Sequence, residues 1–387
     1  MGLRALVFVL LLLLPSAPRA AELVFVLESG EVLSEESADQ LWHPASLTKL
    51  MTAYVVFQEL ATRRLALSDV VTASEAAETQ PPTSLGLAEG RELTIEEALL
   101  GLLLRSGNDT AVVLAEAVAG SESAFVARMN ATARRLGLSA TIFHNASGLP
   151  DESQVTTARD LALLARALIL DFPQYYWMFG LPGFTFAGDW KGNINGILGS
   201  LTGADGLKTG FTCKSGYNLV VSALRGGRRV IAIILGERSP AQRSDRGRDL
   251  VETAFATLAE EERTAGPQLE PAAPDAAVGP APTVLAENEC GYGTVARLPG
   301  HGVALGAFAG RGKALSVAEA AKARYEAFAE AGTAAVPTRL GVGRYNAVLV
   351  GLSRQEAMSG CRTIRRAGGY CLVLSPQVLN NPRAVWR

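Results

Sequence analysis

The order of strand-like and helix-like segments is the feature that most limits how this chain can fold. Apolar patterning predicts two short strands at 23–27 and 32–33, around a turn. Helical spacing of apolar residues follows, with helices predicted at 46–60, 94–104, 110–119, 121–136 and 157–170. Strands return at 206–212, 217–224 and 230–235, and a helix over 243–259 closes the series. This order predicts an α+β fold in which a helical cluster packs on one antiparallel sheet.

A stretch rich in Pro and Ala separates a second unit from the first. Residues 263–283 have the composition of an extended linker. Beyond 298 the patterns predict strand 303–308, helix 316–331, strand 336–342, strand 346–352, helix 354–367 and strand 370–374. This β-α-β-β-α-β order is the split βαβ arrangement. We therefore divide the chain into 1–20, 21–262, a linker at 263–297, a small domain at 298–377 and a tail at 378–387.

Charge is distributed unevenly between the two units. The whole chain has a net charge of −2, which gives no general reason to expect a nucleic-acid partner. From 298 to the end, twelve Lys and Arg stand against four Asp and Glu. The second unit is therefore expected to meet an anionic partner.

The N-terminus has the pattern of an export signal. Arg4 precedes an apolar run over 5–14, and small residues up to Ala21 follow. The run is too short to span a bilayer, although a buried helix or strand is an alternative interpretation. We place the cleavage near Ala20 and expect a mature chain without a transmembrane anchor, in the periplasm or outside the cell.

Cysteines and histidines give no metal-binding pattern. Cys213, Cys290, Cys361 and Cys371 form no close pair of the zinc-binding kind. An oxidising compartment would allow a bridge between Cys361 and Cys371, and buried free thiols are the alternative. The three histidines, His43, His144 and His301, are too scattered for zinc, so no metal or cofactor is expected.

Ser46 and Lys49 are the first candidates for chemistry. Three residues apart on a predicted helix, they share one face and lie about one turn apart. Serine needs a nearby base to act as a nucleophile, and a lysine can serve if burial or another cation lowers its pKa. Alone, the pair is also compatible with a helix start in which Ser46 is a cap and Lys49 is solvated.

Two further blocks favour the catalytic interpretation of Ser46 and Lys49 over the structural one. Ser106-Gly107-Asn108 lies between two predicted helices, where small polar residues are common for structural reasons alone. Lys208-Thr209-Gly210 lies on a predicted strand, where the glycine would let a ligand approach the backbone. In this order, and in helix, loop and strand contexts, the three blocks form the motif set of penicillin-recognising serine enzymes.

The first unit resembles the low-molecular-mass penicillin-binding D-alanyl-D-alanine carboxypeptidases. The resemblance rests on the segment from Pro44 to Ala53 and on further blocks at 104–109, 145–150, 157–162, 193–195, 205–212 and 215–220. It covers about 22–258. It implies removal of the terminal D-alanine from peptidoglycan stem pentapeptides through an acyl-enzyme, with β-lactams as covalent inhibitors.

The resemblance also assigns roles to residues. Ser46 would be the nucleophile, Lys49 its general base and Ser106 a proton relay to the leaving D-alanine. Asn108 would orient the substrate backbone. The terminal carboxylate would be held by Lys208 and Thr209 of the Lys208-Thr209-Gly210 strand, with Arg243 as a further cation. The N–H groups of Ser46 and Phe211 would form the oxyanion hole.

Some positions depart from the family pattern. Gln154 stands where these enzymes often have histidine, and Gly196 where a larger residue is usual. The β-rich second domain and amphipathic C-terminal anchor of many members have no counterpart in the pattern. Contact with the cell wall is therefore expected to differ.

The second unit resembles a sporulation-related repeat (SPOR) domain. The matching residues are Leu305-Gly306-Ala307-Phe308, the alanine-rich helix after them, Val350-Gly351-Leu352 and the segment 368–373. The resemblance implies binding to glycan strands stripped of their peptides, often at division sites. A small packing domain with a basic surface is the alternative.

Other functions stay open at this point. A D,D-endopeptidase would use the same residues. A β-lactamase is disfavoured because no Glu-x-x-Leu-Asn segment is present to place a deacylating water. A non-catalytic wall-binding protein is disfavoured by the intact Ser46, Lys49, Ser106 and Lys208.

Overall fold

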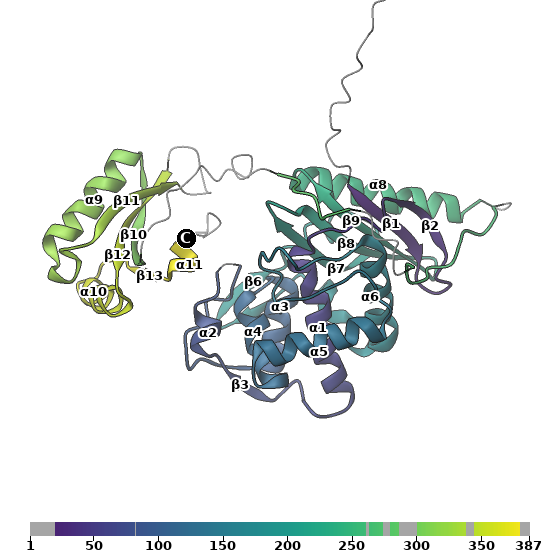
Figure 1. Ribbon diagram of the computed structural model, residues 1–387, viewed down its shortest axis with the longest axis horizontal. Coiled ribbons are helices and arrows are strands. Elements are labelled where there is room, and N and C mark those ends of the chain that lie inside the picture. Colours follow the sequence, from purple (N-terminus) through teal and green to yellow (C-terminus); the bar gives the residue numbers. More distant parts are fainter. Residues whose placement is uncertain are drawn as a thin grey trace, which may run out of the picture.

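The computed structural model of the chain describes residues 20–81, 83–260, 263–273, 279–285, 300–337 and 344–379. Residues 1–19 of the predicted signal segment and all but the first two residues of the predicted tail lie outside these ranges. Figure 1 shows the first unit in purple to teal and the C-terminal unit in green to yellow.

A five-stranded antiparallel sheet organises the first unit. Its order is β2-β1-β9-β8-β7, so β7 forms an edge with a single neighbour in the sheet. The strands are β1 (Ala21–Val26), β2 (Val32–Glu36), β7 (Ala204–Thr212), β8 (Gly216–Arg225) and β9 (Arg228–Glu237). The first strand of the unit, β1, and its last strand, β9, thus pair inside the sheet. The predicted α+β fold with one antiparallel sheet is confirmed.

Alternation along the strands sends apolar side chains to both faces of the sheet. Val24, Val221 and Ile234 pack against α8 (Pro240–Leu258) on one face. Residues of the opposite parity, such as Phe25 and Ile233, pack against the helical cluster on the other face. Figure 1 shows α8 on one side and the cluster on the other. The cluster contains α1 (Thr48–Ala61), α3 (Ile95–Leu104), α4 (Asn108–Ala119), α5 (Glu122–Arg135) and α6 (Ala158–Asp171).

Capping residues explain where these helices begin. Thr157 accepts a hydrogen bond from the N–H of Asp160 and caps α6. Helix α8 begins three residues before the predicted start, because Ser239 caps it and Pro240 fits its first turn. Thr94 forms a capping box with Glu97 at α3.

Several short elements were not predicted. The hairpin of β5 (Gly183–Phe186) and β6 (Asp189–Gly192) turns at Ala187-Gly188, both with positive φ. The others are the pair β3 (Val70–Thr72) and β4 (Glu92–Thr94), the helices α2 (Glu75–Glu78) and α7 (Trp177–Gly180), and the 3₁₀ turns η1 (Ala45–Leu47) and η2 (Pro173–Tyr175).

The described parts of the Pro/Ala-rich linker contain no helix or strand apart from an isolated bridge between Gln268 and Glu31, and they pack on the first unit. Arg263 pairs with the buried carboxylate of Glu31. The N–H of Leu269 donates to the carbonyl of Gly30 at 2.7 Å. Further on, Val284 and Leu285 are buried. The composition of the linker alone does not indicate which groups of the first unit it contacts.

The C-terminal unit is a four-stranded antiparallel sheet of order β11-β12-β10-β13. Its elements are β10 (His301–Ala309), α9 (Arg311–Arg324), η3 (Glu326–Phe328), β11 (Gly332–Pro337), β12 (Arg344–Leu352), α10 (Arg354–Arg366), β13 (Leu372–Leu374) and α11 (Pro376–Leu379). The order of the main elements is the β-α-β-β-α-β order expected from sequence. Helix α9 begins earlier than expected, directly after Gly310 at a φ of 82°. Strand β11 begins at Gly332, before the expected start at 336, and the expected residues 338–342 lie outside the described ranges.

A disulfide bond joins Cys361 of α10 to Cys371, with a Cα–Cα distance of 5.4 Å. The bridge that the sequence left open is therefore present, and buried free thiols at these positions are excluded. Cys213 is disulfide-bonded as well.

Within the described ranges, no single helix is long and apolar enough to cross a membrane. Only the bent pair of α4 and α5 reaches that length and composition together.

Candidate active site

The turn that leads into α1 carries Ser46, which is partly exposed. The preceding Ala45 has a φ of 49°, a conformation that L-residues rarely adopt. A Cβ on Gly148 would lie 1.9 Å from the carbonyl oxygen of Ala45, and a Cβ on Gly210 would lie 3.2 Å from the nitrogen of Ser46. Glycines from a loop and from β7 therefore allow two backbones to close on the turn. Ser46 is held between them.

Lys49 lies one turn along α1 and points back at Ser46. Its Nζ is 3.2 Å from Ser46 Oγ and 2.8 Å from Asn108 Oδ1, and it also donates to the carbonyl of Ser147. The side chain is fully buried. Burial lowers the pKa of Lys49 well below its ordinary value, the charge of Lys208 lowers it further, and Asp109 opposes the shift. A neutral amine is thus favoured within hydrogen-bonding distance of the serine.

The loop between α3 and α4 supplies Ser106 at a φ of 59°. Its hydroxyl is buried and has no hydrogen-bond partner among the described residues. A buried polar atom without a partner costs free energy, and such atoms collect at functional sites. The carbonyl of Ser106 accepts a hydrogen bond from Thr83 at 2.8 Å, which fixes the loop.

Asn108 contacts protein groups at both ends of its amide. Oδ1 accepts from Lys49, and Nδ2 donates to the carbonyl of Pro81 at 2.7 Å. The adjacent Asp109 is buried and accepts the N–H groups of Gly86 and Leu87. These two side chains brace the segment around 81–87 against the site. Asn108 thus holds Lys49, and the substrate-orienting role expected for it stays a prediction.

Two cations lie buried along β7 and α8. Lys208 is 1% exposed, and its Nζ donates to the carbonyl of the neighbouring Thr209, which is also buried, at 3.0 Å. Burial, with a contribution from Arg243, lowers the pKa of Lys208 to about 7. Arg243 has a buried Nε without a partner, and burial lowers its pKa. Among the described residues no carboxylate pairs with either cation, and the expected role of Lys208 and Arg243 in holding a substrate carboxylate stays a prediction.

Phe211 follows Gly210 on β7, where the strand approaches the Ser46 turn. Its ring stacks on Tyr217 of β8 with centroids 3.8 Å apart. The two residues whose N–H groups were expected to form the oxyanion hole thus lie on backbones that face each other. All nine sequence-predicted residues lie on the segments that converge on this site.

Two positioning residues escaped the prediction. Asn218 of β8 donates to the carbonyls of His43 and Pro44, at 3.0 and 3.2 Å, and accepts the N–H of Gly236. Trp42 donates from its indole to the carbonyl of Ser215 at 2.9 Å. These bonds tie the chain before Ser46 to the sheet. Asn218 stood inside a recognised block, but nothing in its spacing indicated this role.

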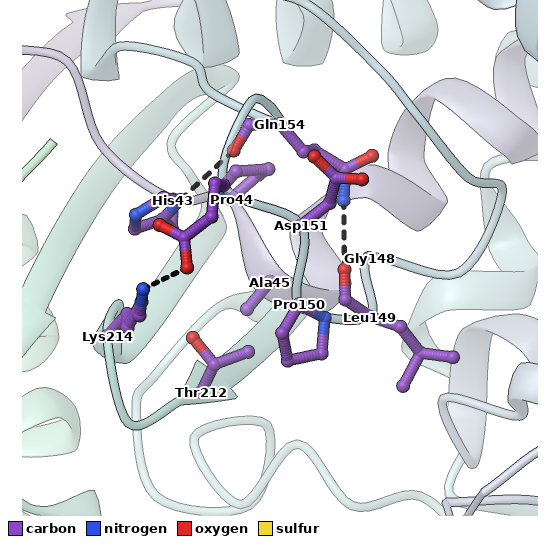
Figure 2. A pocket seen from close by; sticks show the side chains of 11 residues that line it. His43, Pro44, Ala45, Gly148, Leu149, Pro150, Asp151, Gln154, Thr212 and Lys214 are labelled. Carbon is purple, nitrogen blue, oxygen red and sulfur yellow. Dashed lines mark hydrogen bonds and ion pairs between the residues drawn. The ribbon is translucent and has the colours of Figure 1, made fainter. Parts of the chain in front are cut away.

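A pocket of about 170 Å³ opens beside the serine turn (Figure 2). Lys214 and Asp151 lie on opposite sides of it. Gln154, one of the departures from the family pattern, is buried, and its Oε1 accepts the N–H groups of His144 and Asn145. It braces the loop that forms one wall. The pocket is lined by His43, Pro44, Ala45, Gly148, Leu149, Pro150, Asp151, Glu152, Gln154, Thr212 and Lys214.

Comparison with known proteins agrees with this geometry. A model of the D-alanyl-D-alanine carboxypeptidase family matches residues 16–239. D-alanyl-D-alanine carboxypeptidase DacC of Escherichia coli is 39% identical over 248 residues, which is 62% of each chain. DacA of the same species is 38% identical over 253 residues, 63% of each chain. The match thus spans less than two thirds of the length of these curated relatives.

Solved structures show the same fold. Penicillin binding protein 5 of Haemophilus influenzae aligns with a TM-score of 0.59 and 33% identity, over 61% of this chain and 70% of that one. Penicillin-Binding Protein D2 of Listeria monocytogenes, solved in a cefotaxime-bound form, aligns with a TM-score of 0.56 and 34% identity, over 61% and 96%. With the family match covering more than half of its length, this chain belongs to the D-alanyl-D-alanine carboxypeptidase family.

Proposed function

We propose that the protein is a serine D-alanyl-D-alanine carboxypeptidase that removes the terminal D-alanine from peptidoglycan stem pentapeptides. The observation that carries the proposal is the buried Lys49, with its lowered pKa and its Nζ 3.2 Å from Ser46 Oγ. A serine hydroxyl becomes a useful nucleophile only when a neighbouring base can take its proton. A neutral amine at this distance is such a base.

Acylation follows from the positions of the surrounding groups. Lys49 accepts the proton of Ser46 while Oγ attacks the carbonyl carbon of the penultimate D-alanine. The N–H groups of Ser46 and Phe211 stabilise the oxyanion, a contribution of about 3–4 kcal/mol for one such donor in other hydrolases. The hydroxyl of Ser106 has no hydrogen-bond partner among the described residues. It passes a proton to the departing amine, and the C–N bond breaks.

The substrate is held by its free carboxylate. Lys208, Thr209 and Arg243 provide two cations and a hydroxyl, and no carboxylate among the described residues competes for them. Binding an anion would stabilise the charged form of Lys208. Water then hydrolyses the ester on Ser46 and releases the shortened peptide. No metal or cofactor is required by these steps.

A direct test follows labelled penicillin and D-alanine together. Wild-type protein should become covalently labelled and should release D-alanine from a synthetic pentapeptide, whereas Ser46→Ala should do neither. Ser244→Ala, at a half-buried position of α8 where the hydroxyl donates to the carbonyl of Pro240 in the same helix, serves as the matched control. Equal labelling of wild type and Ser46→Ala would overturn the proposal.

We propose in addition that the C-terminal unit is a SPOR domain that binds glycan strands, and that the protein is exported to the periplasm. Support comes from the element order, the basic composition and the sheet face opposite the helices. On that face Asn346 is 3% exposed and its Nδ2 lacks a partner among the described residues. Val348, Val350 and Leu374 belong to a separate small apolar cluster of the C-terminal unit.

Sedimentation with purified peptidoglycan sacculi tests this second proposal with the full chain. Asn346→Ala should lower the bound fraction, whereas Met358→Ala, at an exposed position of α10, should leave it unchanged. If the wild-type chain does not sediment with sacculi, the C-terminal unit does not bind glycan.

A further inference from the structure

We infer that the exposed indole of Trp190 is a stacking platform for the sugar rings of a glycan strand, beside the active site at the end where the terminal D-alanine leaves. The inference rests on the proposed carboxypeptidase function, because that function makes the wall polymer the substrate. It gives a role to an aromatic residue of the β5–β6 hairpin that the catalytic steps do not use.

The hairpin turns Trp190 away from the protein. Phe184 and Phe186 are buried on one face of it. Successive side chains of a strand point to opposite faces, so Thr185 and its cross-strand partner Trp190 lie on the other face. Trp190 is 63% exposed there. The largest apolar side chain of the hairpin is therefore directed into solvent.

Two glycines give the indole a seat. Gly183 and Gly192 pair across the hairpin, on the same face as Trp190. A Cβ on Gly183 would lie 2.6 Å from Cζ2 of the indole, and a Cβ on Gly192 would lie 3.7 Å from its Nε1. The indole therefore lies across this bare pair, while most of its surface stays open. A ring that is already placed loses little conformational freedom when a ligand stacks on it.

The platform is joined to the loop that carries Ser106. Arg105, the residue before Ser106, donates from Nη1 to the carbonyl of Gly192 at 2.8 Å. The N–H of Ile194 donates to the carbonyl of Leu104 at 3.0 Å. Both ends of this short segment thus bond the loop between α3 and α4. A ligand on the platform lies beside the active site.

The hairpin also marks one end of that site. Nδ2 of Asn193 donates to a carbonyl of α7 at 3.2 Å. A Cβ on Gly180 of α7 would lie 3.0 Å from the carbonyl oxygen of Asp205, so α7 packs against the start of β7. With the substrate carboxylate at Lys208 and the oxyanion at Phe211, the stem peptide extends toward the other end of β7. The platform therefore meets a neighbouring wall strand, not the strand that carries this peptide.

The chemistry of the surface fits a neutral sugar ring. Within 183–192, all of which the structure describes, the face that carries the indole has a threonine hydroxyl and two glycines. Asp189 and Lys191 have the opposite parity and pair with each other. The faces of an indole are electron-rich, so they attract the slightly positive C–H face of a pyranose while its hydroxyls stay in water. Glycan strands of the wall supply such rings.

The test compares two substrates with the full-length protein: purified sacculi rich in pentapeptides, and a free pentapeptide. Release of D-alanine is measured at amounts of sacculi well below saturation. Trp190→Ala should lower the rate on sacculi by about fivefold, the size expected of one aromatic contact. Its kcat/KM for the free pentapeptide should equal that of the wild type.

Further variants identify the kind of contact. Trp190→Phe keeps an aromatic ring and should retain most of the rate on sacculi. Trp190→Leu keeps apolar surface without a ring and should behave like Trp190→Ala. Leu170→Ala, which removes another exposed apolar side chain, is the matched control and should act as the wild type does. The C-terminal unit is present in every variant, so its own binding to glycan does not cause differences between them.

A binding measurement that does not depend on catalysis completes the test. In isotope-labelled protein the indole N–H signal of Trp190 is identified by its absence from the spectrum of Trp190→Phe. Peptide-free glycan oligosaccharides should shift this signal. The signal of Trp177, another exposed tryptophan, should stay in place.

The outcomes separate the two proposals. If Trp190→Ala slows both substrates by the same factor, Trp190 only supports the active-site loop and the inference is wrong. If Trp190→Leu keeps the wild-type rate on sacculi, the surface binds an apolar partner, which also overturns it. No D-alanine from either substrate overturns the proposed function, and the oligosaccharide titration then decides the platform alone: an unmoved Trp190 signal overturns it.

Discussion

Replacing Lys208 by methionine should stabilise the folded protein while removing its activity, and the stabilisation should depend on pH. Lys208 is buried on β7 and donates a hydrogen bond to the carbonyl of its neighbour Thr209. The positive charge of Arg243 adds to the effect of burial on the pKa of Lys208. Methionine has a similar length and no charge to desolvate. The substitution therefore removes an unfavourable burial without leaving a large cavity.

The magnitude follows from the shift in pKa. In the unfolded chain the lysine has its ordinary pKa of 10.5, and in the folded chain the pKa is about 7. Between these values the unfolded chain binds a proton that the folded chain does not, so the stability of the wild type rises with pH across this window. Below pH 7 both states are protonated and the full cost remains. The cost is about 5 kcal/mol at pH 6 and falls to about 1 kcal/mol at pH 10.

Urea unfolding of both proteins at several pH values measures this difference. The free energy of unfolding of Lys208→Met should exceed that of the wild type most at pH 6 and least at pH 10. Lys191→Met, a change at the β5–β6 hairpin, controls for the loss of a lysine charge elsewhere. A stability difference that does not change with pH would refute the reasoning, because Lys208 would then titrate alike in both states.

Three further predictions concern the site and the second unit. Lys49→Ala should lower the rate of penicillin acylation by about 10²–10⁴, the usual contribution of a general base, with folding retained by circular dichroism; unchanged acylation would place the base elsewhere. Gly210→Ala should slow acylation measured with a fluorescent penicillin, because its Cβ would lie 3.1–3.2 Å from the backbone of the serine turn, and an unaltered rate would show that the turn can move aside. Breaking the Cys361–Cys371 bond by a double alanine substitution should destabilise the C-terminal unit by about 3 kcal/mol, seen as a lower thermal midpoint; a midpoint that reductant and substitution both leave in place would contradict this.

Sequence patterns predicted the main elements of the first unit because most of its strands and helices bury a regular apolar face. They predicted the catalytic candidates because Ser46, Lys49 and Lys208 belong to short motifs with a fixed spacing. Both kinds of signal depend on side-chain identity at neighbouring positions.

Contacts made by main-chain groups had no such signal. Lys49 donates to the carbonyl of Ser147, and Asn218 donates to two carbonyls before Ser46. Any residue could supply those carbonyls, so only the fold reveals which ones are used. The β5–β6 hairpin was missed although its Ala187-Gly188 turn has both residues at positive φ, because alanine is an unusual choice at such a position.

The same limit applies to the linker. A composition rich in Pro and Ala predicts extended backbone, and it says nothing about whether that backbone finds partners. Here Leu269 and Val284 each donate an N–H to a carbonyl of the first unit.

The hydrogen bonds of Val284 and Leu285 also limit how far the C-terminal unit can lie from the first unit. The last described hydrogen bonds between the linker and the first unit stand at the rim of the pocket, and fourteen residues, 286–299, separate them from the C-terminal unit. A fully extended chain of that length spans at most about 50 Å. If the C-terminal unit binds glycan as proposed, the linker keeps the bound strand within reach of the cleft. Stem peptides in that neighbourhood are met at a high local concentration, whatever their concentration elsewhere in the wall.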